Sequence, residues 1–286
     1  MLIMIKIAIQ KSGRLNEESL EILKQCGILI DNGKDQLKAA ARNFPIEVLY
    51  LRNGDIPQYL RDGVVDLAII GENLILEKGQ DITVVEKLGF SKCRVCIAVP
   101  KDVNYNGIND LQGKKIATSY PNTVKEYLRK NNISAELHII NGSVEIAPNI
   151  GLADAICDIV SSGSTLFKNN LKEVETIMKS ESVLAQAPAL STDKLELMEK
   201  LRFRLRSVLR AKKSKYILLN APNDKINKIS KILPVLKSPT ILPLAKKGWS
   251  SLHSVIDEVS FWEVIDELKT AGAEDILVCP IEKMVL

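Results

Sequence analysis

The sequence predicts an α/β protein of two lobes, followed by a smaller module with a sheet of its own. Short apolar runs alternate with helical patterns through residues 5–160, which is typical of strands joined by helices in a largely parallel sheet. One long helical pattern follows, and residues 212–286 then show a different order of elements. The chain of 286 residues is long enough for two or three domains.

The first lobe is expected to comprise residues 1–94 and 185–211. Its patterns predict strands at 5–10, 46–51 and 67–70 and helices at 17–26 and 57–62. The apolar run at the N-terminus is interrupted by Lys6 and is not followed by a small-residue cleavage site. It therefore indicates the first strand of a sheet rather than a signal peptide or a membrane span.

The second lobe is expected over residues 95–184. A second series of patterns predicts strands at 94–100, 115–118, 135–140 and 155–160 and a helix at 122–130. A Ser/Gly/Thr loop at 161–165 follows the last of these strands, and the helical pattern of 166–177 comes next. The second lobe is therefore expected to be a similar α/β unit.

Residues 184–211 form one long helical pattern, which we expect to close back onto the first lobe. The module at 212–286 then predicts the order βαββαβ, with strands at 216–221, 239–245, 249–256 and 275–281 and helices at 225–233 and 261–272. This order is the ferredoxin-like plan of one small sheet covered by two helices. Such modules often act as small-molecule sensors or assembly units, and the fold alone does not decide between them.

Composition excludes several classes of partner. The net charge is +4 and the 39 basic residues are spread along the chain, so nucleic-acid binding is not indicated. Five scattered cysteines favour a reduced, cytoplasmic protein. Cys93 and Cys96 have the spacing of a metal or redox pair, but His138 and His253 are the only histidines. Because a structural zinc site needs four ligands, core packing is the favoured interpretation of this pair.

The loop at 161–165 has the residues of a phosphate site. Gly163 permits a positive φ and close approach of the backbone to an anion. The loop also offers hydroxyl donors to phosphate oxygens, from Ser161, Ser162, Ser164 and Thr165. Asp154 and Asp158 precede the loop and are expected to accept hydrogen bonds from the two hydroxyls of a ribose. A polar turn is the alternative for the loop alone, and the acids favour a ribose phosphate.

Seven motifs follow one another along the chain: KSGRL at 11–15, RNGDIPQYLRDGVVDLAIIGEN at 52–73, KIATSYPNT at 115–123, GSVEIAP at 142–148, GLADAICDIVSSGSTL at 151–166, KSPTILPL at 237–244 and DILVCPIEKM at 275–284. They resemble the motifs of ATP phosphoribosyltransferases. Each motif is weak by itself, but seven in one order are specific, and they cover the whole chain. The chain resembles the long form of the family, because its tail is similar to that form's regulatory domain.

The resemblance implies a fold, a reaction and a regulator. The two lobes would have the fold of periplasmic solute-binding proteins, with the active site in the cleft between them. N1 of the adenine of ATP would attack C1 of phosphoribosyl pyrophosphate and release pyrophosphate, which is the first step of histidine biosynthesis. Mg²⁺ would be carried by the substrate phosphates. The tail would bind L-histidine as a feedback inhibitor, and the family forms homo-oligomers, both dimers and hexamers.

Departure of pyrophosphate builds positive charge on the ribose, so the site needs cations on the leaving group. Lys11, Arg14, Arg52 and Arg94 are the expected cations, with Arg52 and Arg94 assigned to the nucleotide. Lys11 and Arg14 flank Gly13 directly after the first strand, where the loops of a parallel sheet face the crevice. These two residues are therefore assigned to catalysis.

Further contacts are expected at three turns. Gly71 and Glu72 follow the strand at 67–70, and Glu72 can accept from the adenine amino group or position a magnesium water. Ser119 and Tyr120 occupy the matching turn of the second lobe, where Tyr120 can stack on a base, bind a phosphate or pack on the sheet. The resemblance places Glu145 near the ribose or nucleotide, where it could take a proton from the N6 amino group. Because N1 carries no proton, positioning and electrostatics can supply most of the catalysis.

The resemblance places histidine binding at the loops 238–240 and 273–275, with Thr240 and Asp275 as its residues. The amino group of histidine needs a carboxylate or a carbonyl, and its carboxylate needs N–H donors. An ordinary strand residue is the alternative for Thr240.

Two alternatives to this enzyme stay open on the sequence. The lobes could form a cytoplasmic small-molecule sensor without catalysis, although a sensor does not require two acids beside a phosphate loop. The chain could also transfer phosphoribosyl to a different base. The family commonly has two adjacent acids before its loop, whereas residues 155–157 separate Asp154 from Asp158 here.

Overall fold

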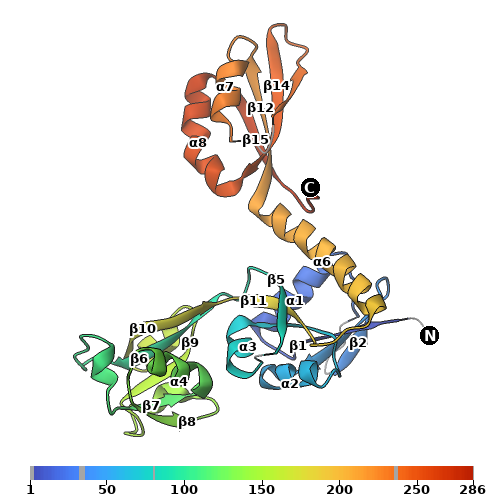
Figure 1. The fold of residues 1–286 in the computed structure, drawn as a ribbon. Helices are drawn as coiled ribbons and strands as arrows, with labels where there is room; N and C mark the ends of the chain where they lie inside the picture. Colours follow the sequence, from blue (N-terminus) through green and yellow to red (C-terminus); the bar gives the residue numbers. More distant parts are fainter. Residues whose placement is uncertain (1–2, 32–35, 80, 235–237, 286) are drawn as a thin grey trace. The chain divides into compact units, whose positions relative to one another are not determined.

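The computed structural model describes residues 3–31, 36–79, 81–234 and 238–285 (Figure 1). The chain divides into two compact units, Met1–Glu199 and Lys200–Leu286. The first unit contains two sheets with helices and the second contains one, so the predicted α/β class is confirmed. Lys237, the first residue of the motif at 237–244, lies outside the described residues.

The sheet of the first lobe has six strands in the order β2-β3-β1-β4-β11-β5. Their bounds are β1 (Ile5–Gln10), β2 (Lys38–Ala40), β3 (Ile46–Leu51), β4 (Leu67–Gly71), β5 (Thr83–Lys87) and β11 (Ser182–Gln186). β3, β1 and β4 are parallel, whereas β2, β11 and β5 pair antiparallel with their neighbours. The expected largely parallel sheet is therefore a mixed one, because three short strands join it outside the alternation of apolar runs and helices.

Helices α1 (Arg14–Gln25), α2 (Ile56–Arg61) and α3 (Glu72–Lys78) belong to the first lobe, and a 3₁₀ turn, η1 (Asn53–Asp55), precedes α2. Pro57 in the first turn of α2 is tolerated because the first N–H groups of a helix have no partner within it. α2 and α3 pack on the sheet through an apolar cluster that includes Ile56, Leu60 and Leu74. The carboxyl ends of β1, β3 and β4 then share one edge of the sheet.

The sheet of the second lobe has the order β10-β6-β9-β7-β8. Its strands are β6 (Cys93–Pro100), β7 (Lys115–Thr118), β8 (Glu136–Ile139), β9 (Ala155–Val160) and β10 (Leu171–Ser180), and its helices and turns are η2 (Ile108–Leu111), α4 (Pro121–Lys130), η3 (Val144–Ile146) and α5 (Ser164–Lys168). β9, β7 and β8 are parallel, whereas β6 and β10 are antiparallel. This sheet is therefore also mixed.

Two helix predictions are wrong in part. The helix expected at 166–177 ends at Lys168, and β10 occupies most of the remainder. β10 is an edge strand with two register shifts against β6, so its side chains do not show a regular alternation. The helix expected at 184–211 begins later, as α6 (Thr192–Lys213), because Leu184 lies in β11. The expected lobe boundaries at 94/95 and 184/185 accordingly fall inside β6 and β11.

The chain passes between the lobes of the first unit twice. Residues 88–92 lead from β5 to β6, and Glu181 separates β10 from β11. The start of α6 belongs to the first lobe, where Lys194 Nζ lies 2.7 Å from Asp66 Oδ1. The two lobes of the first unit are therefore joined by two connections, and the start of α6 contacts the first lobe.

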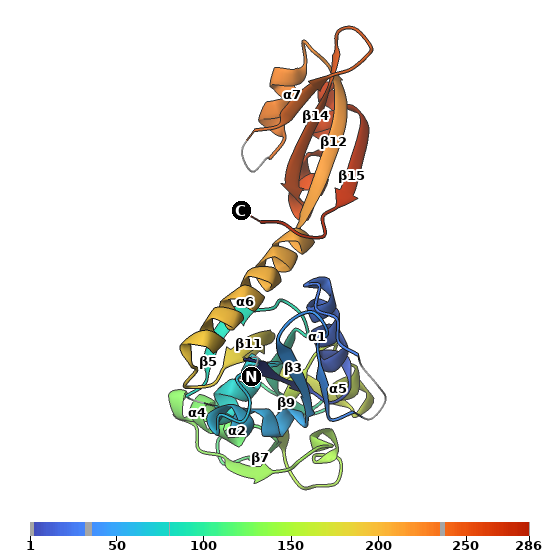
Figure 2. The same cartoon turned by 90° about the vertical axis from the view of Figure 1, so that its right-hand side faces the viewer.

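The second unit contains a four-stranded antiparallel sheet in the order β13-β14-β12-β15. Its elements are β12 (Ser214–Pro222), α7 (Ile226–Ile232), β13 (Thr240–Pro243), β14 (Trp249–Asp257), α8 (Glu258–Ala271) and β15 (Glu274–Pro280). This is the predicted βαββαβ order, and α7 and α8 cover the sheet (Figures 1 and 2). Asp257 accepts from Val259 N at 2.9 Å at the start of α8, and Gly272 ends the helix with φ 102°.

In the described part of the chain, no helix combines the length and the apolar character that crossing a bilayer would require.

Candidate functional site

The loop after β9 forms the rim of a small pocket. Gly163 takes φ 80°, a conformation that residues with a Cβ rarely adopt, and α5 begins at Ser164. The four hydroxyl residues of the loop are exposed, and Ser162 Oγ donates to Ser164 Oγ at 3.1 Å. A pocket of about 200 Å³ is lined by this loop together with Glu145 and Asp158. The structure therefore brings the predicted loop, including Thr165, and two of the predicted acids together.

Asp158 is the acid that approaches the loop from β9. Burial raises the pKa of its carboxyl group, a hydrogen bond from Ile159 N at 2.7 Å opposes that shift, and the charge of Glu145 adds to it. Because Asp158 also lines the small pocket, its carboxylate is placed to accept hydrogen bonds from a ligand. A sugar hydroxyl supplies the donor that such a partly buried carboxylate needs.

Asp154 lies at the other end of the same strand, which corrects the expected acid pair. Its Oδ2 accepts from Lys115 N at 2.8 Å, and its Oδ1 lies 4.0 Å from Lys114 Nζ. It lines a different pocket of about 700 Å³. Residues 155–157 lie between the two acids, which puts them about 13 Å apart along an extended strand, so they cannot hold the two hydroxyls of one ribose. Their closeness in the sequence therefore does not make them neighbours in the fold.

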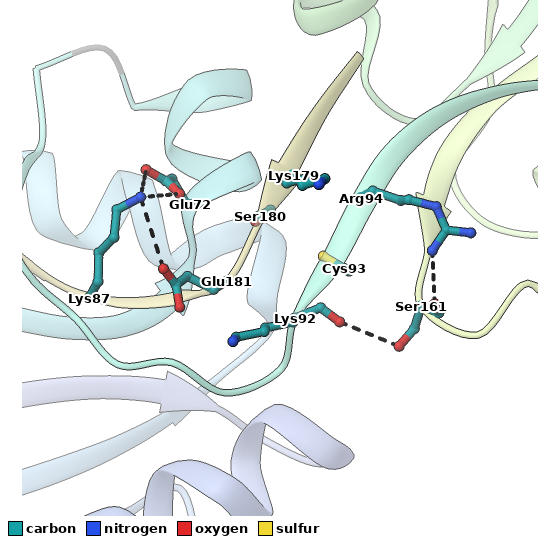
Figure 3. Close-up of a pocket in the computed structure, with 9 residues that line it drawn as sticks. All are labelled: Glu72, Lys87, Lys92, Cys93, Arg94, Ser161, Lys179, Ser180 and Glu181. Atoms are coloured by element: carbon teal, nitrogen blue, oxygen red, sulfur yellow. Dashed lines mark hydrogen bonds and ion pairs between the residues drawn. The ribbon is translucent and has the colours of Figure 1, made fainter. Parts of the chain in front are cut away.

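A pocket of about 490 Å³ lies between the two lobes (Figure 3). It is lined by Glu72, Lys87, Lys92, Cys93, Arg94, Ser161, Lys179, Ser180 and Glu181. Lys87 Nζ lies 3.2 Å from Glu72 and 4.0 Å from Glu181, so its charge is shared with the protein's own acids. Within the described ranges, the ion pairs of this pocket involve Lys87 and Arg94, and no carboxylate forms an ion pair with Lys92 or Lys179. Two cations of this pocket therefore remain available to an anionic ligand.

The sequence patterns did not identify Lys87, Lys92 and Lys179 as residues of this pocket. Lys179 lies on β10, where a helix was expected, and Lys92 lies in the connection before β6. A correct strand prediction for 171–180 would have placed Lys179 near the crossing between the lobes. No local pattern singles out Lys87 or Lys92, because their roles arise from the position of the second lobe.

Arg94 links the phosphate loop to Glu173. Its Nε and Nη2 donate to both oxygens of Glu173 at 2.6–2.9 Å, and its Nη1 donates to Ser161 O at 3.0 Å. The hydrogen bonds from Arg94 lower the pKa of Glu173 to about 2, with smaller contributions from Cys96 and Thr176. Arg94 therefore orients the loop while its charge is largely paired, rather than serving as a free cation for the nucleotide.

Arg14 connects the first lobe to the same loop. Its Nη1 donates to Ser161 Oγ at 3.4 Å, and its Nε lies 3.3 Å from Glu18 Oε1. The Ser91 hydroxyl also donates to Glu18, which places the connection at 88–92 beside α1. Arg14 is 61% exposed, so it can turn toward a ligand without leaving a buried contact.

The remaining first-lobe candidates share the carboxyl edge of the sheet. Lys11 N donates to Leu51 O at 2.7 Å, which sets Lys11 beside Arg52 at the ends of β1 and β3. Gly71 and Glu72 lie at the end of β4, where α3 begins. Of these four residues, Glu72 lines the pocket between the lobes, and Lys11 and Arg52 are exposed beyond its lining.

The matching turn of the second lobe is occupied by the protein itself. Ser119 Oγ donates to Ile140 O at 2.6 Å, so its proton is not available to a ligand. Tyr120 precedes α4, and burial and the neighbouring charge of Asp158 raise the pKa of its hydroxyl. The first turn of α4 donates to Glu77, a residue of the first lobe that no local sequence pattern singled out.

The two thiols of the Cys93–Cys96 pair have different surroundings. Cys96 is buried and donates to Glu173 Oε1 at 3.0 Å, and burial raises its pKa to about 12. Cys93 is half-buried at the wall of the pocket between the lobes. Among the described residues, no group of three or more His, Cys, Asp or Glu side chains could hold a metal ion.

The two residues expected to bind histidine lie far apart in the second unit. Thr240 begins the edge strand β13 opposite His253, and Asp275 lies at the start of the other edge strand with φ 47°. Asn220 Nδ2 donates to Asp275 Oδ2 at 3.0 Å. Three strand spacings separate the edges, about 14 Å, so one histidine cannot contact both residues of the same chain.

Comparisons with known proteins cover nearly the whole chain. The family model described as ATP phosphoribosyltransferase matches residues 52–207, and the model described as HisG, C-terminal domain, matches residues 211–283. The ATP phosphoribosyltransferase of Cytophaga hutchinsonii is 56% identical over 281 residues, which are 98% of each chain. That of Bacteroides thetaiotaomicron is 53% identical and covers 99% of this chain and 100% of the relative.

A solved structure extends the comparison to the fold. The ATP phosphoribosyl transferase (HisG:HisZ) complex from Thermotoga maritima is 29% identical, with a TM-score of 0.60 over 71% of this chain and 99% of that chain. The relatives named above are enzymes, so the alternative of a non-catalytic sensor is not favoured. From the two family models and the full-length identity, the chain belongs to the ATP phosphoribosyltransferase family.

Proposed function

We propose that the chain transfers the phosphoribosyl group of phosphoribosyl pyrophosphate to N1 of ATP in the pocket between its lobes. The observation that carries this proposal is the convergence on Ser161. Arg14 of the first lobe and Arg94 of the second both donate to this residue, which joins the phosphate loop to a cavity lined by cations. The same geometry serves a reaction in which an anionic leaving group departs from a sugar phosphate.

The loop at 161–165 would hold the 5′-phosphate through its hydroxyls and backbone N–H groups. Asp158 would accept from a ribose hydroxyl, and Lys92 and Lys179 would face the pyrophosphate, where negative charge develops as the bond to C1 breaks. The adenine would lie toward Glu72, which can accept from its amino group. Because N1 already has a lone pair, no base has to activate it, and catalysis rests on positioning and charge.

The acids fit a magnesium ion that arrives with the substrate. Mg²⁺ prefers oxygen ligands and commonly keeps several waters while it binds substrate phosphates and one or two carboxylates. Glu145 and Asp158 are the carboxylates beside the loop, and they would hold such an ion through its waters. When bound, Mg²⁺ would neutralise charge on the departing pyrophosphate.

Asp158 and Asp154 give a matched pair of variants that tests this assignment. Asp158→Asn keeps the shape of the side chain but weakens the acceptor, and we expect kcat/KM for phosphoribosyl pyrophosphate to fall by about 10–100-fold. Asp154→Asn makes the same change at the far end of β9 and should stay within about twofold. The measurement is the near-ultraviolet absorbance change of adenine on N1 substitution, with pyrophosphatase present.

Two results would count against the assignment. No absorbance change with folded wild-type protein would remove the transfer reaction. Equal losses in both variants, or a loss confined to Asp154→Asn, would move the ribose to the other pocket.

Regulation and assembly form a second part of the proposal. The chain carries its own HisG C-terminal domain at 211–283, and we infer that this unit binds L-histidine and inhibits transfer. Since Thr240 and Asp275 lie about 14 Å apart, they would serve different histidine molecules or different copies in a homo-oligomer, a dimer or hexamer. The Thermotoga maritima enzyme, by contrast, is a complex of HisG with HisZ. Histidine inhibition of this chain purified alone supports self-contained regulation, and its absence argues for a separate partner.

The cysteines suit a reducing compartment. Over the described ranges, none of the five cysteines is joined to another by a disulfide, and ATP is the proposed substrate, so we place the reaction in the cytoplasm.

A further inference from the structure

Glu77 is a buried carboxylate that joins the two lobes. It lies on α3 of the first lobe and is 3% exposed. Asn122 N donates to its Oε1 at 3.0 Å, and Thr123 N and Oγ1 each donate to its Oε2 at 2.8 Å. Asn122 Nδ2 also donates to the Glu77 carbonyl oxygen at 2.9 Å. One residue of the first lobe therefore accepts every one of these bonds from the start of α4.

These bonds satisfy the first turn of α4 completely. The preceding residue, Tyr120, makes no side-chain cap, and Pro121 has no N–H to satisfy. The next two donors of the turn, Asn122 N and Thr123 N, both reach Glu77. A carboxylate at this position also faces the positive end of the helix dipole. Glu77 therefore caps α4 from a different lobe.

The two helices that Glu77 joins each lead to one side of the pocket. α3 begins at Glu72, which lines the pocket on the first-lobe side. α4 follows Tyr120, which interacts electrostatically with Cys93 on the second-lobe side of this pocket and with Asp158 beside the phosphate loop. The chain crosses between the lobes at 88–92 and at Glu181, and a rotation of one lobe against the other would take place at these two short connections. A buried charged contact between α3 and α4 limits such a movement, because breaking it leaves a carboxylate and two N–H groups without partners.

We propose that Glu77 is a positioning residue, a latch that sets the second lobe against the first so that the two substrates meet at reacting distance. The proposal rests on the transfer reaction assigned above. The phosphate loop that would hold phosphoribosyl pyrophosphate belongs to the second lobe, whereas Glu72 belongs to the first. An error of about 1 Å in the distance between reactants can cost about 100-fold in rate, so the latch acts on kcat.

The test compares Glu77→Gln with Glu126→Gln in the full chain. Both variants remove one negative charge, but Glu126 lies on the exposed side of α4 and pairs with Arg129 of the same helix. For Glu77→Gln we expect kcat to fall at least tenfold, while KM for phosphoribosyl pyrophosphate stays within about twofold. Hydrogen exchange of the peptide containing Asn122 and Thr123 should become faster. Glu126→Gln should leave all three quantities unchanged.

A second pair of variants covers the case in which Glu77→Gln does not fold. Thr123→Ala removes one donor and should lower kcat about threefold, and Thr123→Ser retains the hydroxyl and should restore it. Faster exchange with unchanged kcat overturns the proposal, as does a parallel change in kcat and KM. Should the wild-type protein lack transfer activity, the proposed function fails, and the exchange experiment still decides whether Glu77 caps α4.

Discussion

Two neighbouring turns of the second lobe occupy equivalent places and have opposite surroundings. β9 and β7 are adjacent parallel strands, and each leads directly into a helix, α5 or α4. The turn into α5 keeps its hydroxyls exposed around a pocket, whereas the turn into α4 is filled by the carboxylate of Glu77. A strand end and a helix start therefore do not make an anion site unless the first-turn donors are unoccupied.

The local residues account for part of this difference. In the turn into α5, Gly163 adopts a positive φ, which residues with a Cβ rarely do. In the turn into α4, Pro121 is the first residue of the helix, and the hydroxyl of Ser119 already donates to Ile140 O. The turn into α5 thus leaves its hydroxyls exposed, whereas the turn into α4 is bound to Glu77 of the first lobe.

Matched threonine variants would test this contrast most strongly. Thr165→Ala removes a donor from the open turn, and we expect kcat/KM for phosphoribosyl pyrophosphate to fall by roughly 10–100-fold, equivalent to about 1.5–3 kcal/mol. Thr123→Ala removes a donor from the closed turn and should leave KM for this substrate within about twofold. Steady-state kinetics of both variants would measure the difference, and an increase in KM for Thr123→Ala alone would reverse the roles of the turns.

A pH experiment would test how the open turn is supported. The pKa of Glu173 falls from 4.5 to about 2 on folding, chiefly through its hydrogen bonds to Arg94, so the pair stabilises the fold above pH 4.5 and loses this effect as pH falls through 2. After allowing for partial exposure, we expect about 1–2 kcal/mol of stabilisation at neutral pH. Urea unfolding of wild type and Glu173→Gln at pH 6 and pH 3 would measure it. A stability difference that does not shrink at the lower pH would contradict the expectation.

The parts of the fold that the sequence predicted have strong local signals. β1 and β3 match their expected bounds because most of their residues are apolar, with Lys6 and Glu47 as exceptions, and several of them are buried in the sheet. β10 was missed because it is a bulged edge strand rich in charged residues, and its pattern does not distinguish it from a helix. Local pattern thus identifies central strands better than edge strands.

The site was predicted to the extent that it is contiguous in sequence. The loop and Asp158 follow one another along the chain, so their proximity needed no knowledge of the fold. Asp154 was misplaced because closeness in the sequence was taken for closeness in space, whereas a separation of four positions spans about 13 Å in the strand that was itself predicted. Glu77 was missed because its partners are 45 and 46 residues away and in another lobe. Contacts of this kind depend on how the two sheets meet.

The smallest expected effect concerns Cys93, which lies near both turns. It lines the pocket between the lobes, and it interacts electrostatically with Tyr120. Burial raises its pKa, while hydrogen bonding to Ser180 and the charge of Arg14 oppose the shift, so little thiolate is present at neutral pH. We expect Cys93 to react with iodoacetamide several-fold more slowly than the exposed Cys279, and more slowly again with phosphoribosyl pyrophosphate bound.

Peptide mass mapping of the alkylated protein, with Cys93→Ser as the control, would measure both rates. Protection of Cys93 by the substrate would mean that the ligand of the open turn extends into the pocket between the lobes. Labelling of Cys93 that is insensitive to the substrate would instead confine the ligand to the loop, and the pyrophosphate would then need cations other than Lys92 and Lys179.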